Sequence, residues 1–166
     1  MRRPRPEDAD AIFARYANDA DVTRLLGWPR HESVDATRAF VEFSDAEWGR
    51  WPAGPYLVES RADDGLLGGT GFGFETPYRA AKGYVFAKDA WGKGYATEAL
   101  RAVVDIARGV GLVRLYALCH VENPASWRVL EKCGFAREGV LRRHCVFPNL
   151  KADDPCDVLC YALVLK

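Results

Sequence analysis

The stretch Ala90–Leu100, AWGKGYATEAL, begins with the composition of a flexible loop and ends with that of a helix. From Ala96 to Ala107, apolar residues recur at helical spacing, and charged residues fall on the opposite face. Two glycines, Gly92 and Gly94, stand just before this helix. Backbone N–H groups at a helix start lack partners within the helix, and glycines let an anion approach them. The stretch therefore predicts a loop that binds a phosphate or diphosphate group.

The spacing of the glycines separates this loop from two better-known phosphate-binding loops. The sequence lacks the GxxxxGK[ST] pattern of a Walker loop, and Thr97 stands where a GxGxxG motif has its last glycine. A Gly-Lys-Gly turn alone is also compatible with an ordinary loop. The anion hypothesis gains support from the strand that precedes the loop and from a second helix start at Asn123–Ser126.

The residues before the loop predict two helices and then three strands. Helical periodicity indicates helices over 6–18 and 33–48, the second with Ser33 as N-cap. Residues 55–75 predict a hairpin around the turn ADDG, because an Asp-Gly turn between apolar runs is a strong hairpin signal. Residues 83–88, GYVFAK, form the strand that leads into the loop.

The residues after the loop's helix predict a buried strand, a short helix and two further strands. The short helix has Asn123 as N-cap, Pro124 at its first position and Gly134 at its end. No repeat, low-complexity tract or linker divides the sequence, so we expect one mixed α/β (α+β) domain over residues 1–166. The predicted ranges are 113–121 for the buried strand, 123–134 for the short helix, and 135–147 and 157–166 for the last strands.

Composition limits the partners and the compartment. The 166 residues suffice for one domain with a core, and 23 basic residues balance 23 acidic ones. We therefore expect no nucleic-acid or membrane partner. The N-terminus MRRPRPEDAD lacks the apolar core of a signal peptide, so we expect a cytoplasmic protein, monomeric or homodimeric. The five cysteines show no CxxC spacing, which favours buried free thiols over a metal site or a disulfide framework.

Three segments carry a resemblance to a known family: WGKGYATEAL, HVENPASWRVLEKCGF and REGVLRRH. They resemble the GNAT superfamily of acyl-CoA-dependent N-acyltransferases, in particular the branch that acetylates the N-termini of ribosomal proteins. The resemblance extends from RPEDADAIF to DVLCYALVL. It implies a twisted, mostly antiparallel sheet, splayed between its fourth and fifth strands and flanked by helices. It also implies transfer of an acyl group, acetyl above all, from acyl-CoA to a primary amine by direct attack in a ternary complex.

The resemblance assigns residues to the acyl-CoA site, with no metal. In the family signature Q/R-x-x-G-x-G/A, Trp91 takes the first place here and Gly94 and Ala96 the others. The segment before the signature corresponds to a strand whose backbone pairs with the pantetheine arm. Asn123 and Ser126 match a polar pair beside the thiol of CoA. The full set implied for acetyl-CoA is Val85, Phe86, Ala87, Trp91, Gly92, Lys93, Gly94, Tyr95, Ala96, Thr97, Asn123 and Ser126.

Several of these residues also have a purely structural interpretation. Asn123 is a good helix cap on its own, and Ser126 could face solvent. Trp91 could pack under the loop, and Lys93 could only be solvated. Trp28, Trp48 and Trp51 either line an acceptor pocket or pack in the core or at its rim.

The sequence departs from the family pattern at the proposed acid and base. Many members have a tyrosine on the short helix that protonates the leaving thiolate; Leu130 occupies that place here. Members of the N-terminal branch often have a carboxylate base near the end of the following strand, where this chain reads LRRHCVF. His144 is then the nearest titratable candidate, with Glu59 and Glu75 as further ones. Strand alternation would put His144 and Arg142 on one face. Only MRRP precedes RPEDADAIF, so the first strand is very short or incomplete.

The chemistry of the acceptor favours an α-amine. An α-amine with a pKa of about 7.7 to 8 is roughly a tenth neutral at pH 7, whereas a lysine near 10.4 is neutral at only a few parts in ten thousand. A site without a strong base therefore favours a protein N-terminus. The alternatives are a polyamine or an aminoglycoside as acceptor, a longer acyl group such as succinyl, and a CoA-binding sensor without turnover.

Overall fold

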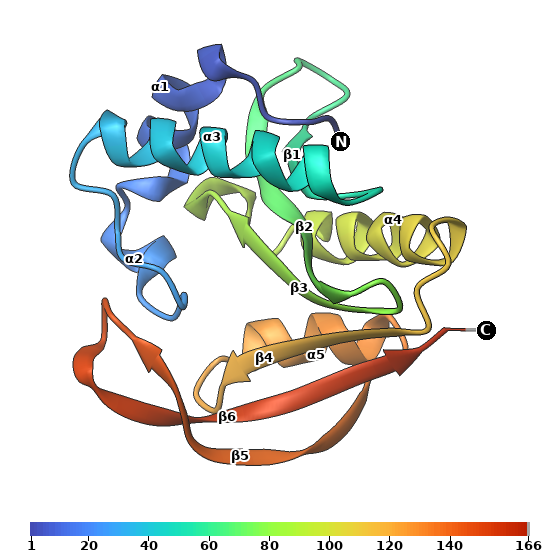
Figure 1. Ribbon diagram of the computed structural model, residues 1–166. Helices are drawn as coiled ribbons and strands as arrows, with labels where there is room; N and C mark the ends of the chain where they lie inside the picture. The colour runs from blue at the N-terminus through green and yellow to red at the C-terminus, as the bar shows by residue number, and fades with distance from the viewer. Residues whose placement is uncertain (166) are drawn as a thin grey trace.

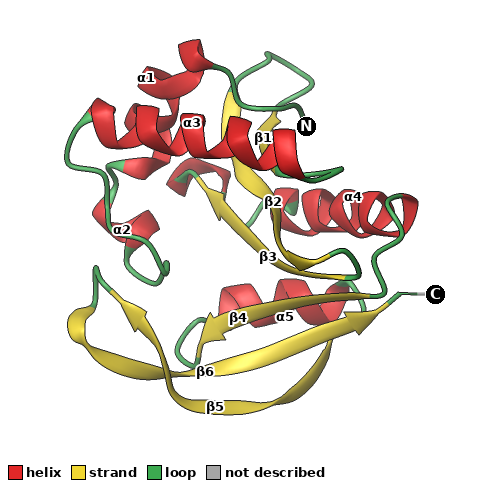
Figure 2. Ribbon diagram, in the orientation of Figure 1, coloured by secondary structure: helices red, strands yellow, loops and turns green. Residues whose placement is uncertain are grey.

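The computed structural model describes residues 1–165, which contain a six-stranded sheet flanked by helices (Figures 1 and 2). The strand order across the sheet is β1-β2-β3-β4-β6-β5, so only the last two strands depart from chain order. This mixed α/β architecture confirms the predicted fold class. The strands are β1 (Pro55–Glu59), β2 (Leu66–Thr76), β3 (Arg79–Phe86), β4 (Arg114–His120), β5 (Ala136–Phe147) and β6 (Lys151–Val164).

The sheet is split between β3 and β4. These two strands run parallel and pair only over residues 79–81 and 114–116, whereas every other neighbouring pair is antiparallel. Arg2 forms an isolated bridge with Leu57: its N–H donates to the Leu57 carbonyl at 3.1 Å and its carbonyl accepts at 2.8 Å. Counted as the first strand, this bridge places the split between the fourth and fifth strands, as predicted.

Helices cover both faces of the sheet. Figures 1 and 2 show α3 on one face and α4 and α5 on the other. The face under α4 and α5 holds the larger core, in which Leu100, Leu115 and Leu130 are fully buried. Within residues 1–165, no helix has the length and apolar character to cross a membrane. The α-helices are α1 (Ala9–Ile12), α2 (Ala20–Thr23), α3 (Val34–Arg50), α4 (Tyr95–Gly109) and α5 (Pro124–Lys132).

Several element boundaries differ from the sequence prediction. The segment expected as one helix over 6–18 is divided into a 3₁₀ turn, α1 and a π-helical turn. Ser33 occupies the N-cap position of α3, but its side chain makes no capping hydrogen bond. β6 begins at Lys151, ahead of the expected 157, because its polar first residues pair only with β5. That stretch has no buried face to impose an alternating pattern, so periodicity could not find it.

The cysteines are all free thiols. Cys119 is buried, but the other four are partly exposed, so the prediction of buried thiols holds only for Cys119. Cys145 and Cys156 lie opposite each other across β5 and β6.

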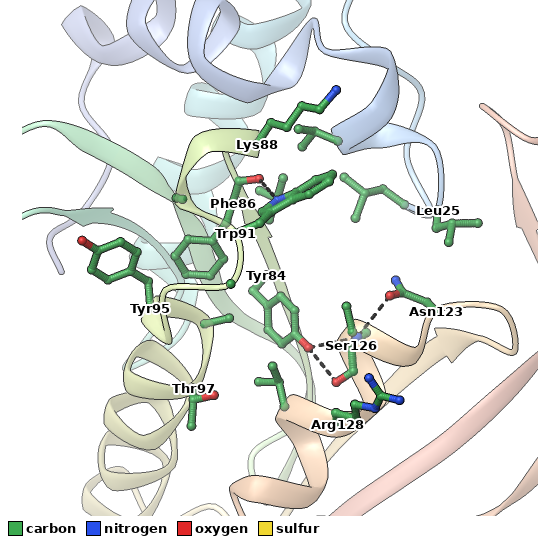
Figure 3. Close-up of a pocket in the computed structure, with 18 of the residues that line it drawn as sticks. Leu25, Tyr84, Phe86, Lys88, Trp91, Tyr95, Thr97, Asn123, Ser126 and Arg128 are labelled. Atoms are coloured by element: carbon green, nitrogen blue, oxygen red, sulfur yellow. Dashed lines mark hydrogen bonds between the residues drawn. The ribbon is translucent and has the colours of Figure 1, made fainter.

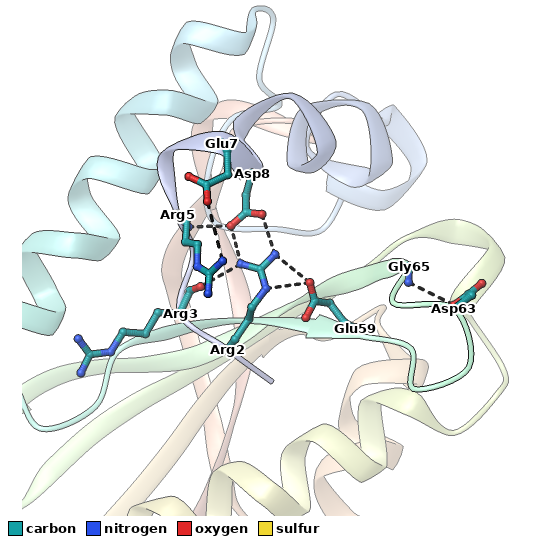
Figure 4. Close-up of polar contacts among 8 residues, drawn as sticks. All are labelled: Arg2, Arg3, Arg5, Glu7, Asp8, Glu59, Asp63 and Gly65. Carbon is teal, nitrogen blue, oxygen red and sulfur yellow. Dashed lines mark hydrogen bonds and ion pairs between the residues drawn. The ribbon is translucent and has the colours of Figure 1, made fainter.

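An ionic cluster fixes the N-terminal residues to the edge of the sheet (Figure 4). The Arg2 guanidinium donates to both carboxylate oxygens of Asp8 at 2.7 Å and to Glu59 Oε1 at 2.8 Å. Asp8 also accepts from the Arg5 N–H at 2.7 Å. The hydrogen bonds from Arg2 lower the pKa of Asp8 below its ordinary value. Bidentate pairing of this kind is among the stronger polar contacts in proteins, and here it holds the first residues against β1.

A second polar contact joins the turn between β5 and β6 to the region around the end of α2. Asn149, in the turn between β5 and β6, donates from Nδ2 to the carbonyls of Thr23 (2.8 Å) and Trp28 (2.9 Å). Its Oδ1 accepts from the Arg30 N–H at 2.7 Å. One side chain thus satisfies three backbone groups between the last residue of α2 and Arg30.

Candidate active site

The loop Trp91–Gly94 delivers a run of backbone N–H groups to the start of α4. Gly92 and Gly94 have φ of 72° and 87°, a left-handed conformation that glycine adopts without a Cβ penalty. A Cβ built at either position meets nothing within 4 Å, so the space in front of the loop is open. The Thr97 N–H donates to the Gly94 carbonyl at 3.0 Å. The N–H groups that precede it in the first turn of α4 have no partner within the helix and are directed beyond its N-terminus. This geometry suits a diphosphate.

A cleft of about 770 Å³ lies between this loop, β3 and α5 (Figure 3). It brings together ten of the twelve residues predicted for acetyl-CoA. Ala87 is outside because it is buried in the core under β3. Lys93 lines a neighbouring hollow, together with Arg15 and Asp89. The ten predicted residues that line the cleft are Val85, Phe86, Trp91, Gly92, Gly94, Tyr95, Ala96, Thr97, Asn123 and Ser126.

The cleft is lined by more cations than anions, which sequence reasoning missed. The positive side chains come from three elements, whereas Asp21 is the carboxylate among the lining residues. Asp21 forms an ion pair with Lys88, and this pair raises the pKa of Lys88 and lowers that of Asp21. A surplus of positive charge attracts a polyanion. These residues lie far apart in the sequence, so no local motif marks them; they are Arg24, Lys88, Arg128 and Lys132.

Asn123 and Ser126 stand at the N-terminus of α5, at the end of the cleft away from the glycine loop. Asn123 Oδ1 accepts from the Ser126 N–H at 3.1 Å, so Asn123 caps the helix and lines the cleft at once. The capping role proposed from the sequence is therefore real, and it leaves the Nδ2 group of Asn123 available to a ligand.

Tyr84, which the sequence reasoning did not select, faces Ser126 across the split (Figure 3). Its hydroxyl oxygen lies 2.9 Å from Ser126 Oγ and 3.0 Å from the Ser126 carbonyl oxygen, and its single proton can be donated to either one. Burial raises the pKa of Tyr84 to about 12. The strand pattern GYVFAK puts Tyr84 on the same face as Phe86, which was the available signal.

Lys82 supports the ring of Tyr84 from within the protein. Its Nζ lies 3.4 Å from the centroid of the Tyr84 ring, and the residue is only 7% exposed. Its electrostatic neighbours are the thiols of Cys119 and Cys133 rather than a carboxylate. Burial therefore lowers the pKa of Lys82 from 10.5 to about 7.

His144 lies outside the cleft. It is exposed on β5, beside Arg143, whose φ is 46°, and the pairing register shifts between Leu141 and Cys145. The regular alternation assumed for this strand is interrupted there. Arg142 and Arg143 form ion pairs with Asp157 and Asp154. The role of His144 as a base stays a prediction, which a pH–rate profile of His144→Ala tests.

Both alternative carboxylates have partners. Glu59 belongs to the ionic cluster with Arg2. Glu75 accepts from the Tyr116 hydroxyl and pairs with Arg79 at 2.8 Å.

The tryptophans mostly have packing roles. Trp48 donates from Nε1 to the Pro55 carbonyl at 2.8 Å, and Trp51 stacks on Phe74 with ring centroids 5.0 Å apart. Trp28 packs against the core under α3. Of the tryptophans discussed, Trp91 lines the cleft, where its indole N–H donates to the Phe86 carbonyl at 2.8 Å and fixes the loop to β3.

The family model described as the acetyltransferase (GNAT) domain matches residues 1–136. The chain therefore belongs to the GNAT acetyltransferase family, as its resemblance indicated, and is an N-acetyltransferase. Among its relatives is the uncharacterized N-acetyltransferase YoaA of Bacillus subtilis (strain 168), which is 32% identical over 99% of this chain and 92% of that protein.

Solved structures share the fold. An acetyltransferase from Salmonella typhimurium that modifies the N-terminal serine of the ribosomal protein L7/L12 superposes with a TM-score of 0.85, at 24% identity, over 99% of this chain and 94% of that one. Spermidine N-acetyltransferase from Vibrio cholerae, solved with CoA and spermine, superposes with a TM-score of 0.82, at 20% identity, over 98% of this chain and 93% of that one.

Proposed function

We propose that residues 1–166, as one domain, transfer an acetyl group from acetyl-CoA to the α-amine of a protein N-terminus. The observation that carries the choice of acceptor is the chemistry of the cleft beside Ser126. The titratable side chains that β3 and α5 contribute to the lining are Tyr84, Arg128 and Lys132, and none of these residue types is a base at neutral pH. An α-amine needs the least help, because a tenth of it is already neutral at pH 7.

The cleft fits acetyl-CoA in size, charge and backbone geometry. Its volume is in the range of cofactor sites, and its positive side chains match the phosphates of CoA. The glycine loop offers N–H groups to the diphosphate, and the open space before Gly92 and Gly94 leaves room for it. The split between β3 and β4 leaves room for the pantetheine arm next to Val85.

The residues at the split supply positioning and hydrogen bonds. Bound acetyl-CoA provides a thioester whose carbonyl carbon accepts the amine. Ser126 would donate to the sulfur, and the Asn123 amide, held by its bond to the Ser126 N–H, would orient the thioester. A thiol with a pKa near 8.5 is a tolerable leaving group, so a hydrogen bond is sufficient help.

The test measures CoA release from acetyl-CoA with matched acceptors. We expect turnover with short peptides that carry a free N-terminus and little with the same peptides after N-terminal blocking, when a lysine is the remaining amine. Spermidine and an aminoglycoside form the second arm, because a structural neighbour acetylates spermidine. A kcat/KM for the small amines above that for the peptides would overturn the choice of acceptor. Tight acetyl-CoA binding with no turnover on any amine would indicate a sensor instead.

A further inference from the structure

Tyr84 and Ser126 form a polar contact across the split, between two elements that line the cleft. They come from β3 and α5, 42 residues apart in sequence, and three oxygen atoms take part: the phenol, Ser126 Oγ and the Ser126 carbonyl. Both residues line the cleft, so a ligand that reaches Ser126 also lies close to Tyr84. Figure 3 shows the phenol and Oγ pointing toward each other from opposite arms.

The two hydroxyls hold one proton each, so their arrangement decides what Ser126 can offer a ligand. If Tyr84 donates to the Ser126 carbonyl, Oγ can use its own proton on the phenol oxygen. If Tyr84 donates to Oγ, the proton of Ser126 is free to point into the cleft. Ser126 is a full hydrogen-bond donor for a ligand only in the second arrangement.

Neighbouring residues hold the Tyr84 ring where its hydroxyl can donate to either oxygen atom of Ser126. Lys82 covers one face of the ring, with its Nζ 3.4 Å from the centroid. On α5, Leu130 is fully buried and carries no proton that could serve the cleft. The hydroxyl of Tyr84 can therefore supply a hydrogen-bond donor near Ser126, which the Leu130 side chain of α5 cannot.

We propose that Tyr84 is a positioning residue for Ser126: its hydroxyl donates to Ser126 Oγ, and Ser126 then donates to the sulfur of bound acetyl-CoA as the carbon–sulfur bond breaks. This inference rests on the proposed function. The amine nitrogen forms the new bond to the acyl carbon, the electron pair of the broken bond goes to sulfur, and the proton released by nitrogen balances the thiolate. Tyr84 and Ser126 keep their own protons.

Retention of these protons follows from relative acidity. The pKa of Tyr84 is raised to about 12, whereas a thiol has a pKa near 8.5. The acid dissociation constant of the phenol is thus smaller than that of the thiol by a factor of roughly a thousand or more, so the phenol keeps its proton. Tyr84 acts by strengthening a hydrogen bond to developing negative charge, and such a bond is strongest in the transition state.

The decisive experiment titrates the thiol of bound CoA, followed by the ultraviolet absorbance of the thiolate. Tyr84→Phe keeps the ring over Lys82 and removes only the hydroxyl. We expect it to raise the pKa of the bound thiol by about one unit, a tenfold change. We expect kcat to fall about tenfold with the KM for acetyl-CoA unchanged. Because the two hydroxyls act in series, Tyr84→Phe should add little to the loss caused by Ser126→Ala.

Tyr78→Phe is the matched control, because it removes the hydroxyl of a tyrosine that is 55% exposed in the turn between β2 and β3. It should leave the thiol titration and kcat unchanged. An unaltered thiol pKa in Tyr84→Phe overturns the inference, and a lower Tm or weaker CoA affinity beside that unaltered pKa would mean that Tyr84 only joins the two arms. The titration needs no acceptor, so it stands apart from the proposed function, which fails if the wild-type protein does not bind CoA.

Discussion

Replacement of Lys82 by methionine should stabilise the protein, and by an amount that depends on pH. Lys82 is buried, and its pKa falls from 10.5 to about 7. Each pKa unit corresponds to about 1.36 kcal/mol, so the buried ammonium costs up to about 5 kcal/mol relative to the exposed one. Methionine keeps a flexible stem of similar length and can contact the Tyr84 ring through its sulfur.

The sign of the pH dependence follows from proton binding. Between pH 7 and 10.5 the unfolded chain keeps the Lys82 proton while the folded protein has lost it. The unfolded state binds more protons there, so the free energy of unfolding of the wild-type protein rises with pH. Two groups that face Lys82 stay neutral up to pH 9, because burial raises the pKa of Cys119 to about 11 and that of Tyr84 to about 12. Burial also raises the pKa of Cys133 above its ordinary value.

Urea unfolding at pH 6, 7.5 and 9 measures the effect. After allowance for the lost cation–π contact, which contributes about 1 to 2 kcal/mol, we expect Lys82→Met to be more stable than wild type by about 2 to 4 kcal/mol at pH 6. The difference should shrink by about 2 to 3 kcal/mol at pH 9. Lys151→Met, at an exposed lysine, is the control and should show no such trend. A difference that is constant with pH, or a less stable variant at pH 6, would refute the reasoning.

Three further predictions concern the loop and the two polar contacts. Gly94→Val should weaken acetyl-CoA binding at least tenfold in calorimetry, because a β-branched residue is strained at a φ of 87° and would fill the diphosphate space; unchanged affinity in a folded variant would remove the loop from the site. Asp8→Asn should lower the free energy of unfolding by about 1 to 3 kcal/mol at pH 7. The depressed pKa of Asp8 means that this contribution is present above pH 4 and lost as pH falls through the folded pKa, so the two proteins should converge in acid; a gap that does not narrow as the pH is lowered below 4 would contradict the ionic explanation. Asn149→Ala should lower Tm by several degrees, because three backbone groups lose their partner, whereas Asn149→Asp should recover only the bond that Oδ1 accepts; equal Tm values for wild type and Asn149→Ala would show that water replaces the side chain.

Local signals predicted the part of the site that lies within continuous segments. The glycines before α4 and the Asn-Pro start of α5 determine backbone geometry by themselves, so their residues could be assigned to the cleft from the sequence. The split of the sheet was predicted only through the family resemblance, because no single segment of sequence determines which strands pair.

Contacts between distant segments were beyond the sequence. The Tyr84–Ser126 contact joins two elements through tertiary packing, and no periodicity announces it. Lys82 sits in a strand where a lysine would ordinarily face solvent, and only the surrounding core makes it buried. The positive φ of Arg143 interrupts the strand alternation that was expected to put Arg142 and His144 on one face.

The narrow junction between β3 and β4 also has a consequence for how the protein opens and folds. Each half of the sheet is built from strands that are contiguous in sequence, over residues 55–86 and 114–164. The two halves pair only where residues 79–81 of β3 meet residues 114–116 of β4. Pairing within each half is local, which favours early formation of two separate cooperative units. Amide hydrogen exchange should therefore report an opening that costs less than global unfolding and exposes the junction. A ligand bound in the split contacts both units, so it should slow that exchange in proportion to its occupancy.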